Sequence, residues 1–138
     1  MREIMNFGTT LNISAAGLTA EGTRLQIIAQ NLANVQSTGS SPGSNPYRRQ
    51  TVSFADRMNS ATGVKMVAVS QIGHDQAPFP LKYDPSNPAA NKQGYVKMPN
   101  VNSFVELMDM QQAERAYNAD LAAMNASRSM LSRTLGLL

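Results

Sequence analysis

The fold is decided near the end of the chain, where residues 103–135 read SFVELMDMQQAERAYNADLAAMNASRSMLSRTL. No proline interrupts this stretch, and apolar residues recur in it every seven positions, which is the spacing of an apolar stripe along an α-helix. Asn102 or Ser103 can cap the first turn, while acidic residues come early and arginines late, the order that the helix dipole favours. We therefore predict a helix from Ser103 to Leu135.

Two apolar columns run along this predicted helix at seven-residue intervals. The first column, which is uninterrupted, contains Met110, Tyr117, Met124, Leu131 and Leu138. The second column contains Leu107, Leu121 and Leu135, and is interrupted by Glu114 and Arg128.

A second long helix is predicted at the start of the chain, within residues 1–36. Its apolar column repeats every seven residues, and one further apolar residue adjoins it; these are Ile4, Leu11, Leu18, Leu25, Leu32 and Ile28. Gly17 and Gly22 lie in this stretch, and a glycine inside a helix costs about 1 kcal/mol relative to alanine. We expect this helix to be marginally stable on its own.

The middle of the chain differs from both ends, because all seven prolines lie between Pro42 and Pro99 and proline breaks helix interiors. Residues 37–62 are predicted to be a linker and extended loop. Residues 63–99 are predicted to form a small β element of short strands, and residues 100–138 contain the C-terminal helix. The predicted fold class is mainly α with a small β element.

Composition excludes several classes of function. The chain has 138 residues, twelve basic and nine acidic, with a net charge of +3 and no run of like charges that would favour nucleic-acid binding. It has no cysteine, so disulfides, cysteine-ligated zinc and thiol catalysis are excluded, and its one histidine, His74, falls in a predicted turn. No apolar stretch approaches the ~20 residues of a membrane span, and we expect no cleaved signal peptide.

No catalytic constellation, metal cluster or cofactor motif emerges from the residues, and we predict neither an enzyme nor a cofactor site. The one basic pair, Arg48 and Arg49, follows Tyr47. This pair can lie on a solvated strand face or contact an acidic groove on a partner protein, and the sequence leaves both open.

The predicted helices are too long for the chain to cover them with its own β element. A helix of 30 to 40 residues is about 45–60 Å long at 1.5 Å per residue, whereas three short strands form a sheet near the lower limit of independent stability. The apolar columns must therefore be buried on each other and on neighbouring chains. The predicted assembly interface comprises Ile4, Leu11, Leu18, Leu25, Ile28, Leu32, Leu107, Met110, Tyr117, Leu121, Met124, Leu131 and Leu135.

A family resemblance accompanies these patterns. The first predicted helix ends with Gln30-Asn31-Leu32-Ala33-Asn34, followed by Ser37-Thr38, which resembles the N-terminal signature of the axial proteins of the bacterial flagellum (rod, hook and hook-associated proteins). Asn31, Leu32, Ala33 and Asn34 match its family motif. Residues 11–18 are similar to the opening of the same family. Further stretches are similar to the short proximal-rod proteins of that family: residues 46–49, 52–54, 63–65, 83–85, 94–96, 98–102 and 113–120. One departure is Asn118-Ala119-Asp120, where the family often has Glu-Ala-Asn.

The resemblance implies a structural subunit of the proximal rod. Its two end helices would pair as an antiparallel coiled coil lining the inner tube, with the β element outside. The implied partners are other proximal and distal rod proteins, the rod-base adaptor and membrane ring, and the flagellar type III export apparatus, with no nucleic acid or small-molecule substrate. The implied location is the periplasm-spanning rod of the basal body, reached without a cleaved signal peptide, where the rod serves as drive shaft and export channel and transmits torque.

One alternative from a different class stays open at this point. The two end helices could form a stable monomeric hairpin, which would make the chain a free-standing helical adaptor. A third class, an enzyme acting on the cell wall or on lipid, lacks a convincing acid/base pair or metal site.

Overall fold

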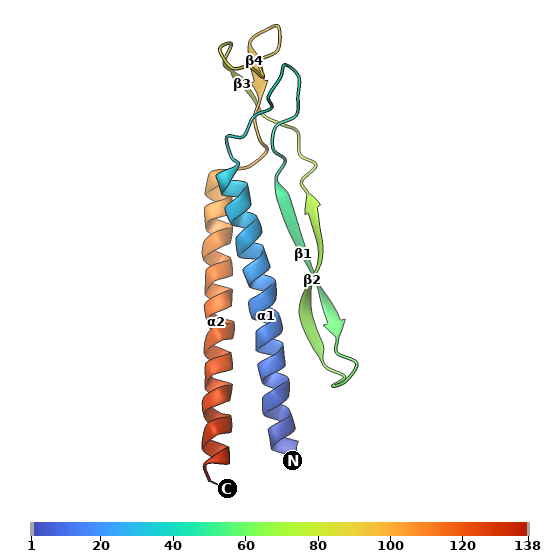
Figure 1. Cartoon of the computed structure of the whole chain (residues 1–138), viewed down its shortest axis with the longest axis vertical. Helices are drawn as coiled ribbons and strands as arrows, with labels where there is room; N and C mark the ends of the chain where they lie inside the picture. The colour runs from blue at the N-terminus through green and yellow to red at the C-terminus, as the bar shows by residue number, and fades with distance from the viewer. Residues whose placement is uncertain (1, 138) are drawn as a thin grey trace. The chain divides into compact units, whose positions relative to one another are not determined.

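The computed structural model describes the backbone of residues 2–137 and the side chains of residues 7–137. Two long helices flank the β region, α1 (Arg2–Ala33) and α2 (Ser103–Leu135). The strands between them are β1 (Gln50–Met58), β2 (Lys65–His74), β3 (Leu81–Tyr83) and β4 (Tyr95–Lys97) (Figure 1). The predicted bounds of the C-terminal helix are confirmed, and the N-terminal helix ends three residues before its predicted limit of 36.

The β region differs from the prediction in three respects. It forms two separate two-stranded sheets, β1–β2 and β3–β4, rather than one three-stranded element. Residues 50–58, which lie within the predicted linker and extended loop of residues 37–62, form strand β1. His74 ends β2 rather than lying in a turn. The sequence-based reading placed the turn at Gly73-His74-Asp75 because of its residue types, but the backbone pairs through this point, where Asp75 N donates to Arg49 O at 2.9 Å.

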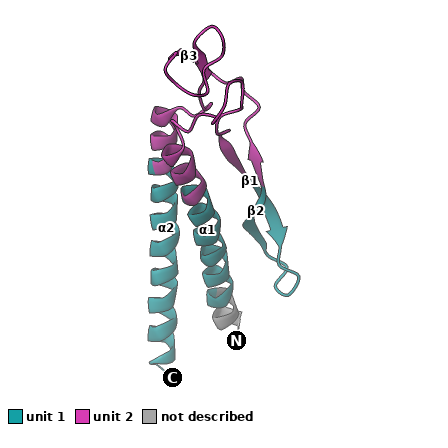
Figure 2. Ribbon diagram, turned by 45° about the horizontal axis from the view of Figure 1, so that its top comes forward, with its two compact units in different colours: residues 1–25, 53–71, 111–138 teal, residues 26–52, 72–110 magenta. Residues whose placement is uncertain are grey.

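The chain forms two compact units, and the long helices contribute to both. Unit 1 contains residues 1–25, 53–71 and 111–138, and unit 2 contains residues 26–52 and 72–110 (Figure 2). Each unit therefore combines a section of α1, a section of α2 and a part of the β region.

In unit 1 the sections of α1 and α2 lie side by side and antiparallel (Figure 2). Gly17 of α1 lies against Asp120 of α2, and Arg24 Nη2 donates to Gln112 Oε1 at 3.4 Å. These two contacts confirm that the helices run in opposite directions in this unit, because the later residue of α1 meets the earlier residue of α2.

The buried residues of unit 1 are small, and no large apolar side chain among those described there is buried to the same extent. They are Ser14, Gly17 and Ala20 on α1, and Ala113 and Ser127 on α2. Small side chains allow helix backbones to approach closely, so this surface brings the two helices together through backbone proximity rather than through large apolar side chains.

The β1–β2 hairpin ends in unit 1 in a tight loop. Asn59 N donates to Val64 O at 2.8 Å, and Gly63 N donates to Asn59 O at 2.8 Å. Gly63 has a φ of 66°, a left-handed conformation that glycine adopts without steric cost. The hydrogen bonds of Asn59 and the conformation of Gly63 therefore determine where the chain turns from β1 into β2.

Unit 2 contains the antiparallel β3–β4 ladder, in which Lys82 pairs with Val96 and Tyr83 with Tyr95. Val96 is buried, whereas the rings of Tyr83 and Tyr95 meet edge to face at 5.3 Å on the opposite, exposed side. Ile27 and Ile28 of α1 supply further buried apolar side chains. Unit 2 also buries two polar residues, and these define the site described next.

Candidate functional site

A fully buried carboxylate, that of Glu106 in the first turns of α2, lies at the centre of a polar cluster in unit 2. Arg49 Nε donates to Glu106 Oε1 at 2.5 Å, and Asn31 Nδ2 donates to Glu106 Oε2 at 3.1 Å. A buried carboxylate is costly unless it is paired and hydrogen-bonded, and here each oxygen has a donor.

Asn31 connects α1 to the segment that enters β1. Its Oδ1 accepts hydrogen bonds from Tyr47 Oη and from Gln50 N, both at 2.9 Å, and its Nδ2 also donates to Gln50 O at 3.0 Å. The amide thus engages both backbone groups of Gln50, as a neighbouring strand would. This is a physical reason for an asparagine at this position of the family motif.

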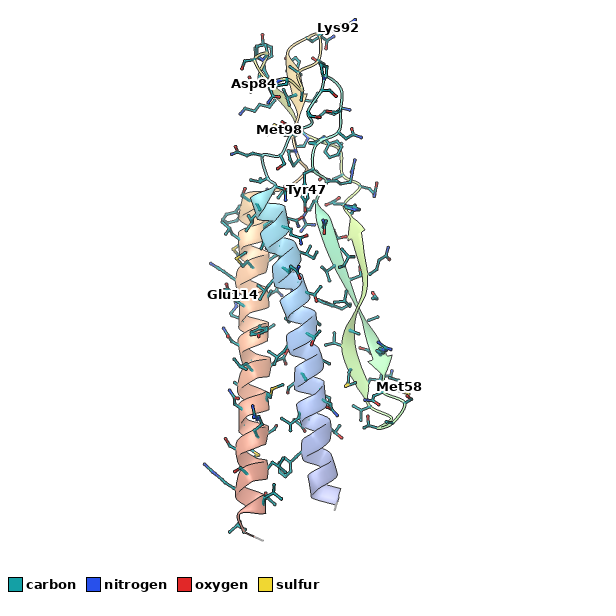
Figure 3. The ribbon with its side chains drawn as sticks, viewed as in Figure 1. Tyr47, Met58, Asp84, Lys92, Met98 and Glu114 are labelled. Atoms are coloured by element: carbon teal, nitrogen blue, oxygen red, sulfur yellow. The ribbon has the colours of Figure 1, made fainter. Side chains whose placement is uncertain are left out.

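The phenol of Tyr47 is held in its protonated form. Burial, followed by the negative charge of Glu106, raises the pKa of Tyr47 above its ordinary value. Tyr47 lies at the upper end of β1 in Figure 3, and its hydroxyl serves as a donor to Asn31.

Arg49 also faces two further carboxylates. Its Nη1 lies 3.7 Å from Asp75 Oδ2, and its Nη2 lies 3.6 Å from Asp109 Oδ2. One guanidinium therefore contacts three carboxylates when Glu106 is included. Asp75 and Asp109 are each about one-third exposed, whereas Glu106 is fully buried.

Arg48 binds the segment that follows β2. Its Nη1 donates to Asp75 O at 2.8 Å and to Ala77 O at 3.2 Å, and its guanidinium lies 4.2 Å from the ring centroid of Phe79. Asn100 Nδ2 donates to the same two carbonyls, each at 3.1 Å. Both arginines of the basic pair thus have partners within the chain, and contact with an acidic partner protein stays a prediction.

This cluster connects structural segments rather than presenting reactive groups. It ties the end of α1, the entry to β1, the exit from β2 and the start of α2 to one another through side chains that bond to each other and to backbone. Among the described side chains, those of residues 7–137, no group of three or more histidine, cysteine, aspartate or glutamate residues could hold a metal ion. Neither described helix is long and apolar enough to cross a membrane.

The apolar columns of the predicted interface differ in exposure. The second column of α2 is exposed, with Leu107 at 50%, Leu121 at 39% and Leu135 at 55%. The residues that are half-buried are Leu11, Leu18, Leu25, Leu32, Met110, Tyr117, Met124 and Leu131. Ile28 is buried, and the side chain of Ile4 lies outside the described residues.

The sequence-based reading missed two features of the molecule. Glu106 was counted only among the early acidic residues that favour the helix dipole, although it is also the buried partner of Arg49, and no local sequence signal points to this pairing. The exposed apolar residues Phe104, Val105 and Met108 were also missed, because they lie off the seven-residue columns. The predicted capping role of Asn102 is confirmed, since its Oδ1 accepts from Phe104 N at 3.0 Å.

Comparison with known proteins identifies the family. Residues 92–137 match the family described as flagellar basal body rod FlgEFG protein C-terminal. A protein of Agrobacterium fabrum, named flagellar basal-body rod protein FlgC, is 44% identical, with 91% of both chains covered. Proteins of the same name from Borreliella burgdorferi and Escherichia coli O6:H1 are 38% and 40% identical, covering 97% and 91% of this chain and 99% and 93% of theirs. The chain therefore belongs to the family of flagellar basal-body rod proteins FlgC.

Proposed function

We propose that this chain is a structural subunit of the proximal rod in the bacterial flagellar basal body, and that it has no enzymatic role. Its relatives are named flagellar basal-body rod proteins, and the similarity covers nearly their whole length. The observation that carries the proposal is the exposed second column of α2, Leu107, Leu121 and Leu135. Apolar surface left uncovered along a helix is typical of a protein–protein interface.

The pairing of α1 and α2 as an antiparallel coiled coil is part of this proposal. It is supported in unit 1 by the contact between Gly17 and Asp120 and by the hydrogen bond from Arg24 to Gln112. The surface where the helices meet is formed by small residues. The half-buried leucines beside it are only partly covered, and neighbouring subunits would complete their burial.

The remaining members of the predicted interface take their place in the same proposal. In an open helical assembly, head-to-tail contacts do not close into a ring, so each subunit needs several apolar surfaces for different neighbours. The half-buried residues Leu11, Leu18, Leu25 and Leu32 of α1 and the exposed leucines of α2 supply such surfaces.

The proposed partners are other proximal and distal rod proteins, the rod-base adaptor and membrane ring, and the type III export apparatus. The proposed location is the rod that spans the periplasm, where the assembled subunits form the drive shaft and export channel that transmit torque. The absence of cysteine suits a subunit that crosses a narrow export channel unfolded, since no disulfide has to be opened.

The test replaces Leu121 with aspartate in a strain that lacks the native protein. We expect Leu121→Asp to be exported but absent from isolated basal bodies, with motility lost, because a buried unpaired carboxylate destabilises an apolar interface. The control is Asn125→Asp, which adds the same charge at an exposed position one turn further along α2. Normal motility of Leu121→Asp would contradict the proposal.

Circular dichroism of the purified chain separates the rod subunit from a free-standing adaptor. A rod subunit should gain helix on assembly, because each helix is covered on all sides only among its neighbours. A chain that is fully helical and monomeric at micromolar concentration would instead support the adaptor.

A further inference from the structure

A cleft of about 570 Å³ lies in unit 1 between α1 and the end of the β1–β2 hairpin. Its wall on α1 is formed by small residues, which are Ala16, Thr19, Ala20 and Thr23. The facing wall includes every residue of β2 from Met66 to Val69. Because successive side chains of a strand point to opposite faces of the sheet, a cleft that borders a continuous run of residues opens onto the edge of the strand. We call this cleft the edge cleft.

The pairing of β1 with β2 determines which backbone groups face away from the hairpin. Asn59 N donates to Val64 O at 2.8 Å, and Ser70 Oγ donates to Ser53 O at 3.0 Å, so both contacts fit one register. In an antiparallel pair, residues that bond to the opposite strand alternate with residues whose N–H and C=O point outward. From Val64 to Ser70, the even-numbered residues therefore bond to β1, and the odd-numbered residues face outward.

The outward groups of β2 lack partners. Among the described residues, none donates to or accepts from the outward backbone groups of Val67 and Val69. Residues 66–71 read MVAVSQ, without the charges or prolines that often protect a free edge from other strands. A two-stranded hairpin is at best marginally stable in water, so a third strand on this edge would stabilise it.

The unpaired backbone groups define the kind of partner. A backbone group that is buried without a hydrogen bond is costly, so any surface that covers the edge has to bond to it. A helix cannot do so, because its own N–H and C=O groups bond along the helix, whereas an extended segment has free groups at the matching spacing.

The wall on α1 defines the side chains that suit this partner. Thr19 Oγ1 donates to Ala15 O at 2.9 Å, and Thr23 Oγ1 donates to Thr19 O at 3.0 Å, so both hydroxyl protons are used inside the helix. The wall therefore presents methyl groups, and these favour uncharged side chains on the partner.

We propose that the edge cleft receives an extended, uncharged segment of a different rod protein, which pairs with residues 66–71 of β2 as a third strand. The proposal rests on the proposed function and names the contact with one neighbour. A second copy of this chain fits less well, because each of its described strands already belongs to a two-stranded sheet. Since α1 forms the far wall of the cleft, a strand that is already paired would bring its partner strand against the helix.

Proline substitution tests the outward edge of β2. Proline lacks an N–H and is accommodated in a strand where its nitrogen faces away from the neighbouring strand, so Val67→Pro should preserve the hairpin but block a third strand. In a strain without the native protein, we expect the amount of Val67→Pro in isolated basal bodies to fall about tenfold, the effect of a lost backbone hydrogen bond. Val67→Ala retains the N–H and should be incorporated like the native chain.

The matched control is Asp56→Pro. Asp56 lies opposite Val67 in the same register and also faces outward, but on the free edge of β1 and outside the lining of the edge cleft. Asp56→Pro should be incorporated and should support motility as the native chain does. Circular dichroism of the purified chains compares the folding of the two proline variants.

Hydrogen exchange measures the same contact without any substitution. The exchange of the peptide that covers residues 65–71 is compared by mass spectrometry between the purified native chain and isolated basal bodies. We expect slower exchange in basal bodies, because a third strand protects the amides of Val67 and Val69.

A photo-crosslinking amino acid at position 69 identifies the chain that fills the cleft. We expect the main product in basal bodies to be a covalent link to another rod protein, within a segment whose own amides are protected from exchange. A main product that links two copies of this chain, or that joins position 69 to a helix of the neighbour, would overturn the proposal.

Failure of the inference and failure of the proposed function give different results. If Val67→Pro is incorporated normally, or if residues 65–71 exchange equally in both samples, the inference is wrong while the rod function stands. Equal loss of both proline variants also overturns it, because the effect would not be specific to the edge of β2. If the native chain is absent from basal bodies, the proposed function fails and the inference fails with it.

Discussion

Unit 2 and unit 1 bury opposite kinds of side chain. Unit 2 buries charge: the carboxylate of Glu106 is fully enclosed and is bonded by Arg49 and Asn31. Unit 1 buries small residues such as Gly17 and Ala113, while Leu121 and Leu135 remain exposed. Unit 2 therefore satisfies its buried polar groups within one chain, whereas unit 1 depends on small residues that let two helices approach closely, and both units leave apolar side chains of α2 exposed.

The largest expected effect breaks the polar cluster of unit 2. Arg49→Met leaves the Glu106 carboxylate buried without its cation, and the removal of one partner of a buried ion pair costs about 3–5 kcal/mol. We expect the free energy of unfolding of unit 2 to fall by about that amount, measured by hydrogen exchange at the amide of Gln50, which Asn31 binds.

The double variant Arg49→Met/Glu106→Gln provides the control for this prediction. A glutamine is neutral and can still accept a hydrogen bond from Asn31, so much of the lost stability should return. If the double variant is as unstable as Arg49→Met, the charge balance is not what holds unit 2 together.

A smaller effect is expected where the helices approach closely in unit 1. A Cβ added at Gly17 would overlap Oδ2 of Asp120, so Gly17→Ala must displace the carboxylate or separate the helices. We expect a loss of about 1–2 kcal/mol, as for other overpacked sites, measured by thermal unfolding of the assembled protein. Gly17→Ala/Asp120→Ala should recover most of it.

Gly22→Ala is the matched control for the close approach. Nothing lies within 4 Å of a Cβ at this position, and alanine favours a helix by about 1 kcal/mol over glycine. Gly22→Ala should therefore stabilise α1. If both substitutions stabilise it equally, the Gly17 contact does not contribute to helix pairing.

The raised pKa of Tyr47 predicts that the stability of unit 2 depends on pH in the alkaline range. Below pH 10.0, the ordinary pKa of the phenol, folded and unfolded chains both carry the proton and stability is unaffected. As the pH rises above that value, the unfolded chain loses the proton first, so the stability of unit 2 falls. Tyr47→Phe should remove this component of the alkaline transition, at a cost of about 1 kcal/mol for the lost bond to Asn31. Identical alkaline profiles for the two proteins would contradict the assignment.

The smallest effect is expected from deletion of residues 40–44. These residues are mostly exposed, and their hydrogen bonds, such as that from Ser44 Oγ to Ser41 O at 2.6 Å, are local. The bond from Tyr47 N to Ser37 O at 2.9 Å already holds the ends of this loop together. Motility of the deletion strain should be close to normal, and loss of assembly would reveal contacts of the loop with a neighbouring molecule.

The sequence alone determined which segments are helical and where α2 begins and ends. Proline confined to residues 42–99 and a seven-residue apolar repeat are local signals, and local signals are sufficient for helices of this length. The resemblance of residues 30–34 and 113–120 also identified the family before any coordinates.

Which helix faces are covered and which polar groups meet depends instead on how distant segments of the chain pack. Leu18 follows Gly17 directly, and one residue turns the helix surface by about 100°, so the leucine column lies to the side of the surface that meets α2 in unit 1. Arg49 and Glu106 are 57 positions apart, and no local pattern indicates that such residues will meet. A periodic pattern shows that a face is apolar, but the partner that buries it depends on how closely two backbones can approach, and here small residues set that distance.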